Sequence, residues 1–258
     1  MRLMKRILSA AAALALSASL LVGCSSGTAS SVPVSASSAA ESTVSSVEET
    51  ASSAVDENEA AAAQLLNDLT GSYQELWPVI LADEYKQTWL DDCTALVGED
   101  NAEAAFEKLS SMVTGDVYGE DAVKAYANGG GAYFCGFTNS LAILTFDGET
   151  STISGTDKDG NVLFSHTYHY IGMEPVRGLY EFQSDDADSG EFTYFFLAPD
   201  TSAETYHIEF RYGSDAEALS QYDTGEYAYW LASGISTDCD QTMIDNCIEL
   251  FCTENLAG

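Results

Sequence analysis

Basic residues and histidines are scarce in this sequence of 258 residues. It contains nine Lys and Arg residues against 41 Asp and Glu residues, and only three histidines. The formal net charge at pH 7 is therefore −32. Such an acidic chain is repelled by phosphate backbones and by anionic lipid surfaces, so we expect no nucleic-acid partner. Divalent cations, basic peptides and cationic polymers remain compatible partners.

The sequence also lacks the common catalytic motifs. It contains no Gly-x-Ser-x-Gly, and Gly129-Gly130-Gly131 is not followed by the Lys-Ser/Thr of a phosphate-binding loop. The stretch Asp157–Asn161 resembles the start of a calcium loop, but its glycine stands at the fourth place rather than the sixth. We interpret that stretch as a hairpin turn. We therefore expect a binding protein rather than an enzyme.

The sequence has one long apolar run, which lies at the N-terminus. Basic residues precede an apolar segment over residues 7–22, which ends in Leu21-Val22-Gly23-Cys24. This arrangement resembles the signal peptide and lipobox of bacterial lipoproteins. We predict a signal peptide over residues 1–23, lipidation of Cys24, and an extracytoplasmic protein anchored by lipid to the bacterial cell membrane. Removal of the signal leaves six basic residues against 41 acidic ones, a formal charge of −35.

Aromatic residues are missing from the first 72 positions. Residues 24–60 are rich in serine and cannot bury enough apolar surface to fold, so we predict a disordered tether there. We predict one folded domain over residues 61–258. After Cys24, five cysteines remain, an odd number that leaves at least one thiol without an intrachain partner.

The periodicity of the folded domain predicts helices and then short strands. The expected helices are Ala61–Leu69, Tyr73–Trp89, Ala102–Met112, Ala216–Tyr222 and Thr237–Phe251. The expected strands are Tyr133–Phe137, Leu141–Phe146, Ser151–Gly155, Val162–Tyr170, Gly178–Phe182, Phe192–Leu197 and Tyr206–Tyr212. Asp-Gly pairs at 147–148 and 159–160 predict hairpin turns. Seven strands at regular spacing are typical of a barrel or a sandwich.

Five segments, in order along the chain, resemble the ZinT/YodA family. They are Leu66–Pro78, Val176–Glu181, Leu197-Ala198-Pro199, His207–Gly213 and Tyr229-Trp230. The resemblance implies a mainly β fold with flanking helices, namely a lipocalin/calycin-like antiparallel β-barrel. It also implies an exported protein that binds zinc, in zinc scavenging or in delivery to a zinc ABC importer or its solute-binding protein.

The family's zinc site resembles a cluster of three histidines, and the resemblance maps these onto specific positions. The first maps to Phe195, which cannot bind a metal, the second to His207 and the third to Glu209. A carboxylate is an acceptable zinc ligand. A longer loop before His207 leaves open a shift by two residues, which would place Thr205 and His207 at the pair instead.

The spacing of His207 and Glu209 suits two ligands of one ion, because residues i and i+2 of a strand project from the same face. Zinc needs at least one more ligand, for which His169 and His166 are the candidates. These two are three residues apart and would point to opposite faces, so at most one can join His207. Glu181 is a further candidate carboxylate.

An alternative keeps the barrel without the metal. Phe195 favours it, and His207 and Glu209 would then lie on a polar strand face, where Glu209 and Arg211 form a charge pair of small value. Such a barrel would bind a small apolar or cationic ligand, or a surface protein.

Overall fold

The computed structural model describes residues 57–198 and 207–257. The predicted signal peptide, Cys24 and the tether up to residue 56 lie outside these residues. Residues 57–60, which we assigned to the tether, are already part of a helix over 57–68. Within the described residues, no helix combines the length and apolarity that a membrane crossing requires.

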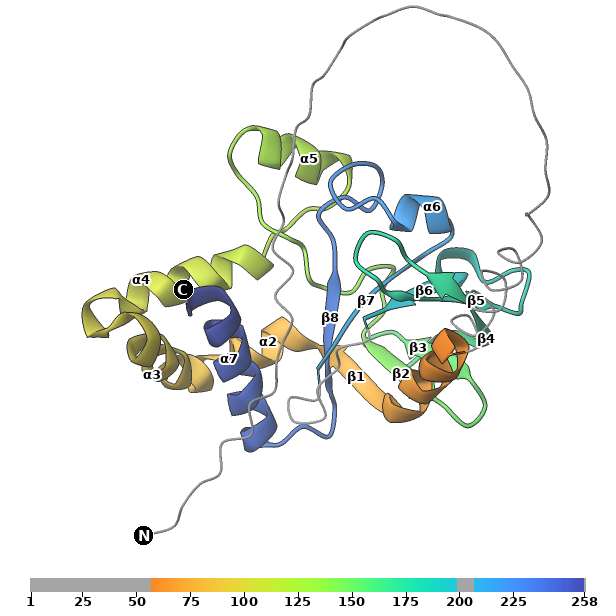
Figure 1. The fold of residues 1–258 in the computed structure, drawn as a ribbon, viewed down its shortest axis with the longest axis horizontal. Helices are drawn as coiled ribbons and strands as arrows, with labels where there is room; N and C mark the ends of the chain where they lie inside the picture. The colour runs from red at the N-terminus through yellow and green to blue at the C-terminus, as the bar shows by residue number, and fades with distance from the viewer. Residues whose placement is uncertain (1–56, 199–206, 258) are drawn as a thin grey trace, which may run out of the picture. The chain divides into compact units, whose positions relative to one another are not determined.

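Eight antiparallel strands form a closed barrel in which each strand pairs with its neighbours in the chain (Figure 1). The strands are β1 (Gly71–Glu75), β2 (Ile143–Asp147), β3 (Thr152–Thr156), β4 (Val162–Met173), β5 (Tyr180–Ser184), β6 (Tyr194–Leu197), β7 (His207–Gly213) and β8 (Ala232–Ser236). Pairing of β1 with β8, in which Tyr73 lies opposite Ser236, closes the barrel. Closure leaves no unpaired sheet edge. The predicted barrel and its flanking helices are confirmed.

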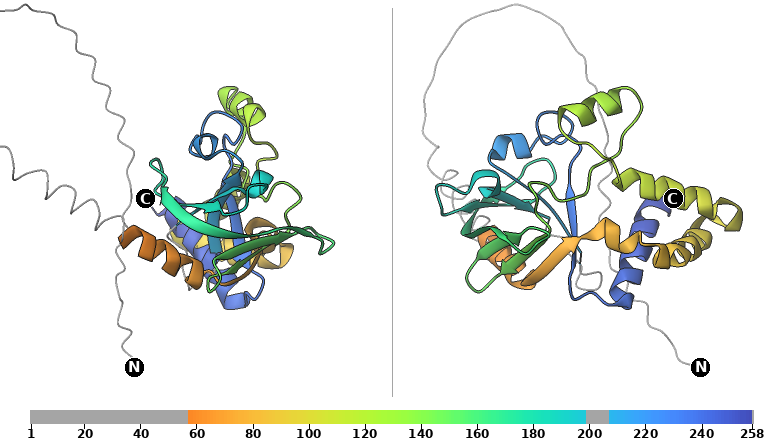
Figure 2. Two further views of the ribbon diagram at one scale, coloured as in Figure 1. Left: turned by 90° about the vertical axis from the view of Figure 1, so that its right-hand side faces the viewer. Right: turned by 180° about the vertical axis from the view of Figure 1, so that it is seen from behind.

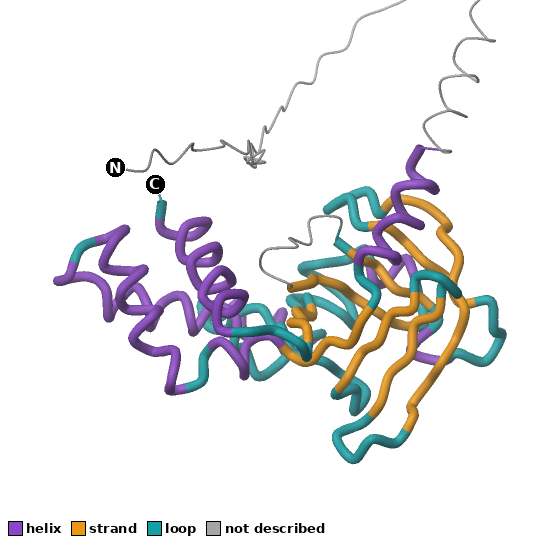
Figure 3. Tube along the Cα trace, turned by 90° about the horizontal axis from the view of Figure 1, so that it is seen from below, coloured by secondary structure: helices purple, strands orange, loops and turns teal. Residues whose placement is uncertain are grey.

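Besides the helix that precedes β1, helices lie between β1 and β2, between β7 and β8, and after β8. They are α2 (Leu76–Ile80), α3 (Lys86–Val97), α4 (Glu99–Val113), α5 (Glu120–Ala127), α6 (Ala216–Leu219) and α7 (Gln241–Leu256), with short 3₁₀ turns at Asp83–Tyr85 and Gly190–Phe192. Helices α3, α4 and α7 pack into a group at one side of the barrel (Figures 2 and 3). Trp89, Leu109 and Ile248 are fully buried in this group. The described chain therefore has two hydrophobic cores, one inside the barrel and one among the helices.

Two strands and one helix were missed by the sequence prediction. Strand β1 (Gly71–Glu75) extends into the stretch that we expected to be the first part of a helix over Tyr73–Trp89. Strand β8 and helix α5 fall in segments without a prediction. Conversely, the expected strand over Tyr133–Phe137 was wrong, because Phe134 forms only isolated bridges, with Thr114 and with Trp230.

Both predicted Asp-Gly turns form. The Asp157 carboxylate accepts hydrogen bonds from the backbone N–H groups of Asp159 and Asn161, both at 2.9 Å, and Gly160 has a φ of +82°. Only glycine adopts that φ without strain. The side-chain amide and backbone N–H of Asn161 lower the pKa of Asp157. The segment is thus a turn between β3 and β4, stabilised by its own carboxylate.

Candidate functional site

The interior of the barrel is filled by aromatic side chains. Phe195 is fully buried, and its ring centroid lies 5.3 Å from that of Tyr212 and 5.4 Å from that of Tyr168. The Tyr212 hydroxyl contacts the backbone N–H of Thr138 at 2.6 Å, and burial raises the pKa of Tyr212. Phe195 therefore fills the place where the resemblance puts the first histidine.

His207 and Glu209 lie on the outer face of β7. Ile208 and Phe210, which alternate with them, are buried in the barrel core. Glu209 stands opposite Ser233 of β8 and near Cys135, where burial and the Glu209 carboxylate raise the pKa of the thiol to about 12. That thiol is protonated at neutral pH, and a metal would have to displace its proton. His207 and Glu209 are both half-buried and project from the same face of the strand, as their spacing predicts.

The two histidines of β4 each contact an aspartate of the loop that follows β5. The Nδ1 atom of His166 lies 2.7 Å from a carboxylate oxygen of Asp186, and the Nδ1 atom of His169 lies 2.6 Å from one of Asp185. The side chain of His166 is 17% exposed and that of His169 is 53% exposed. His166 belongs to the same face as the buried Tyr168, whereas His169 projects from the other face. The two adjacent aspartates thus contact histidines that project from opposite faces of β4.

Strand β4 and strand β7 are separated by β5 and β6 in the barrel. His169 and His207 both project outward, and outward side chains on strands so far apart around a closed barrel point away from each other. His166 projects inward, so the aromatic core lies between it and His207. The described residues contain no group of three or more His, Cys, Asp or Glu side chains that could hold a metal ion. Neither His166 nor His169 therefore completes a site with His207 and Glu209. Glu181, on β5, has its pKa raised by burial and by Glu174, and it joins no such group either.

The alternative without a metal placed Arg211 on a polar strand face, but the residue is buried. Its side chain is fully buried and donates to the backbone carbonyls of Leu219, Gln221 and Tyr227. Its guanidinium carbon lies 4.3 Å from the ring centroid of Tyr222. Arg211 thus holds the segment around α6 against β7, a role that the alternation of the strand could not reveal.

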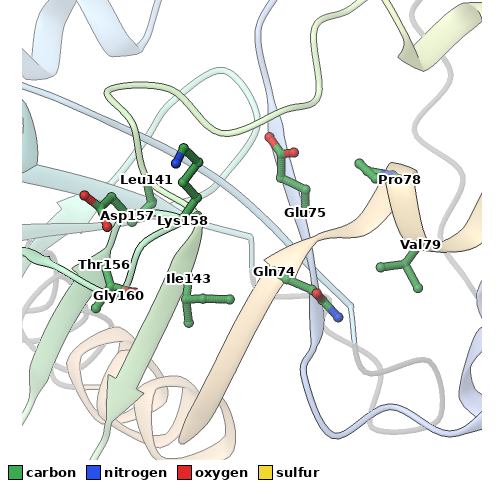
Figure 4. A pocket seen from close by; sticks show the side chains of 11 residues that line it. Gln74, Glu75, Pro78, Val79, Leu141, Ile143, Thr156, Asp157, Lys158 and Gly160 are labelled. Carbon is green, nitrogen blue, oxygen red and sulfur yellow. The ribbon is translucent and has the colours of Figure 1, made fainter.

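One hollow on the surface lies where β1 and α2 meet the hairpin between β3 and β4 (Figure 4). Its volume is about 470 Å³, and its apolar lining includes Val79 and Ile143. Glu75 and Lys158 lie on opposite sides of it (Figure 4). The Glu75 carboxylate accepts a hydrogen bond from the backbone N–H of Phe137 at 2.5 Å. The hollow is large enough for a small molecule with an apolar body.

No protein-family model matches the chain, and the comparison with curated proteins finds no match. Among solved structures, the fold is similar to the Zn(II)-bound ZinT-like domain of Streptococcus pneumoniae AdcA, with a TM-score of 0.45 and 15% identity over 71% of this chain and 89% of that one. It is also similar to Zn(II)-bound AdcA from the same organism, with a TM-score of 0.43 and 14% identity over 72% of this chain. The chain covers 35% of AdcA. The likeness concerns the fold and is too distant to assign ligands.

Proposed function

We propose that this protein is an exported, lipid-anchored binding protein for a divalent metal ion such as zinc. Its role would be to scavenge or buffer the ion for a zinc importer. The acidic composition of the chain supports a cationic ligand, and the series of family-like segments supports zinc. The proposal assigns binding rather than catalysis to the chain, and it anchors the mature protein through Cys24.

The observation that carries the proposal is the pair of His–Asp contacts on β4. A histidine that ligates a metal generally donates its other ring N–H to a carboxylate or a carbonyl, which fixes the ring and makes the ligating nitrogen more basic. In His166 and in His169 the Nδ1 atom is held in this way by Asp186 and Asp185. The Nε2 atom of each ring is then the nitrogen presented to an ion.

Each β4 histidine supplies one nitrogen, and zinc usually takes three or four ligands. An ion bound there would complete its coordination with water. We therefore expect weaker binding than a cluster of three histidines would give. His207 and Glu209 remain a second proposed ligand pair, on a different side of the barrel.

A second candidate function is supported by the hollow beside β1. Its lining combines apolar side chains with the carboxylates of Glu75 and Asp157 and with Lys158, and the apolar side and the carboxylates suit a small apolar ligand that carries a cationic group. This function needs no metal, and it places the ligand outside the barrel, because the interior is filled.

Zinc titration by isothermal calorimetry tests the metal proposal. The chelator-stripped protein is compared with the double variant His166→Ala, His169→Ala and with the double variant His207→Ala, Glu209→Ala. We expect saturable binding that the β4 variant loses and the β7 variant keeps. The reverse result would move the site to β7. Absence of saturable zinc uptake by the unaltered protein would overturn the metal proposal and leave the hollow as the candidate site.

A further inference from the structure

Two cysteines meet in the core of the helical group. Cys93 lies on α3 and Cys252 on α7, and both are fully buried. Their sulfur atoms are 3.9 Å apart. They lie near the aromatic contact between Trp89 and Phe251, whose ring centroids are 6.0 Å apart. Sequence spacing could not reveal this contact, because the two cysteines are separated by 159 positions.

The contact is close to the geometry that a disulfide requires. A disulfide places its sulfurs about 2.05 Å apart, and two thiols in van der Waals contact reach that distance through modest side-chain rotation when the backbone spacing is suitable. Helices α3 and α7 pack against each other, and both cysteines belong to the hydrophobic core between them. Secreted and surface proteins encounter conditions in which such a pair oxidises and stays oxidised.

We propose that Cys93 and Cys252 form a disulfide bond in the exported protein, joining α3 to the C-terminal helix. The inference depends on the proposed export only for the oxidising compartment. The two thiols lose two protons and two electrons, one S–S bond forms between them, and the electrons reduce the disulfide of the oxidant to two thiols. In the cell the oxidant would be a thiol–disulfide oxidoreductase, and in the experiment it is oxidised glutathione.

Burial determines when the bond forms. It raises the pKa of both thiols above their usual value, which suppresses the thiolate that attacks a disulfide. Oxidation therefore belongs to folding, before the helical core closes over the pair. Once formed, the bond is shielded from reductants by the same burial.

Peptide mapping tests the pairing without any assumption about where the protein is located. The full chain is reduced in denaturant, refolded in a buffer of reduced and oxidised glutathione, alkylated, and cut after glutamate by a glutamyl endopeptidase. Cleavage after Glu84, Glu99, Glu249 and Glu254 releases Cys93 in peptide 85–99 and Cys252 in peptide 250–254. Cys247 falls in a different peptide, 227–249, together with Cys239. Because peptide 250–254 contains no cysteine other than Cys252, the mass of a linked product identifies the partner of Cys252 directly.

We expect the dominant linked product to join peptides 85–99 and 250–254. The variant Cys252→Ser should lose it, and the matched control Cys247→Ser, on the same helix, should keep it. The disulfide should also raise the Tm by about 5–15 °C relative to the reduced protein, in the unaltered chain and the control only. Recovery of Cys252 as an alkylated thiol, or linked to any other peptide, would overturn the pairing. Zinc binding is measured separately, so failure here leaves the proposed function unaffected.

Discussion

The direction of each side chain on β7 determines which chemistry it can perform. Ile208 and Phe210 fill the barrel, whereas His207 and Glu209 face outward. The alternation of the sequence predicts two faces of different polarity, and this is correct for these four residues. It does not predict Arg211, which shares the outward parity and is nevertheless fully buried beneath the segment around α6. Burial of that residue depends on a segment that follows it in the chain, which a strand pattern cannot register.

Phe195 occupies the position to which the resemblance maps a metal-binding histidine, and its buried ring fills the barrel interior instead. We predict that Phe195→His lowers the free energy of unfolding by about 2–4 kcal/mol, because an imidazole would replace a phenyl ring among aromatic neighbours without a polar partner. We also predict no gain in zinc affinity through His207 and Glu209, since these two side chains project from the opposite side of the sheet. Urea denaturation and zinc calorimetry measure the two effects. Phe195→Leu is the control for lost volume, and tighter zinc binding by the histidine variant alone would contradict this account of the site.

The two aspartates that hold the β4 histidines give a second prediction. The double variant Asp185→Asn, Asp186→Asn should weaken zinc binding about 10- to 100-fold, because a carboxylate partner orients a ligating histidine and increases its basicity. Calorimetric titration provides the affinity.

The matched control is Asp188→Asn, which removes an exposed carboxylate from the same loop. It tests whether negative charge near the site, rather than the His–Asp contact, attracts the ion. Equal losses per carboxylate in the control and the double variant would refute the orienting role of Asp185 and Asp186.

Elements differ in how far local sequence determines them. The hairpin joining β3 to β4 is specified by its own Asp and Gly residues, and it was predicted. Strand β8 has the sequence ASGIS, whose small residues have little intrinsic preference for a strand. Gly234 in this strand allows close approach, since a Cβ atom there would lie 3.1 Å from a side-chain carbon of Ile208. Barrel closure, rather than propensity, makes this segment a strand.

The contact between α3 and α7 carries an electrostatic cost. Asp92 on α3 is half-buried, and one of its carboxylate oxygens has no hydrogen-bond partner within the described structure. Burial, followed by the charges of Glu249 and Asp245 on α7, raises the pKa of Asp92. A carboxyl group whose pKa is raised by folding binds its proton more tightly in the folded state. Its penalty is therefore complete above the folded pKa, and it disappears as the pH falls below the unfolded value near 3.8.

We predict that Asp92→Asn stabilises the protein at pH 7 by at most about 1 kcal/mol, because solvent screens a half-exposed carboxyl group. The gain should shrink as the pH is lowered toward 4. Thermal unfolding at several pH values measures it, with Asp91→Asn as the control on the exposed face of the same helix. A gain that is equal for both variants, or independent of pH, would contradict the assignment of the cost to Asp92.

At the scale of the whole molecule, charge is the dominant feature. The chain carries a formal charge of −32, and self-repulsion on this scale opposes the compact state. Dissolved salt screens the repulsion, with a Debye length that falls from about 30 Å at 10 mM to about 8 Å at 150 mM. We therefore predict that NaCl raises the Tm by a few degrees over this range. A Tm that stays flat or falls would show that the acidic residues are dispersed too widely to repel one another.

Screening and specific binding are separated by the amount of ion that each requires. At 150 mM NaCl, micromolar zinc changes the ionic strength negligibly, so a further rise in Tm reports zinc binding to the folded state. The stabilisation grows with the logarithm of the ratio of zinc concentration to the dissociation constant. We predict such a rise for zinc, none for magnesium at the same concentration, and its loss in the variant His166→Ala, His169→Ala. Magnesium prefers oxygen ligands, whereas imidazole nitrogen favours zinc. Equal shifts for both ions would mean that the protein collects cations through its acidic surface and that the β4 histidines select none of them.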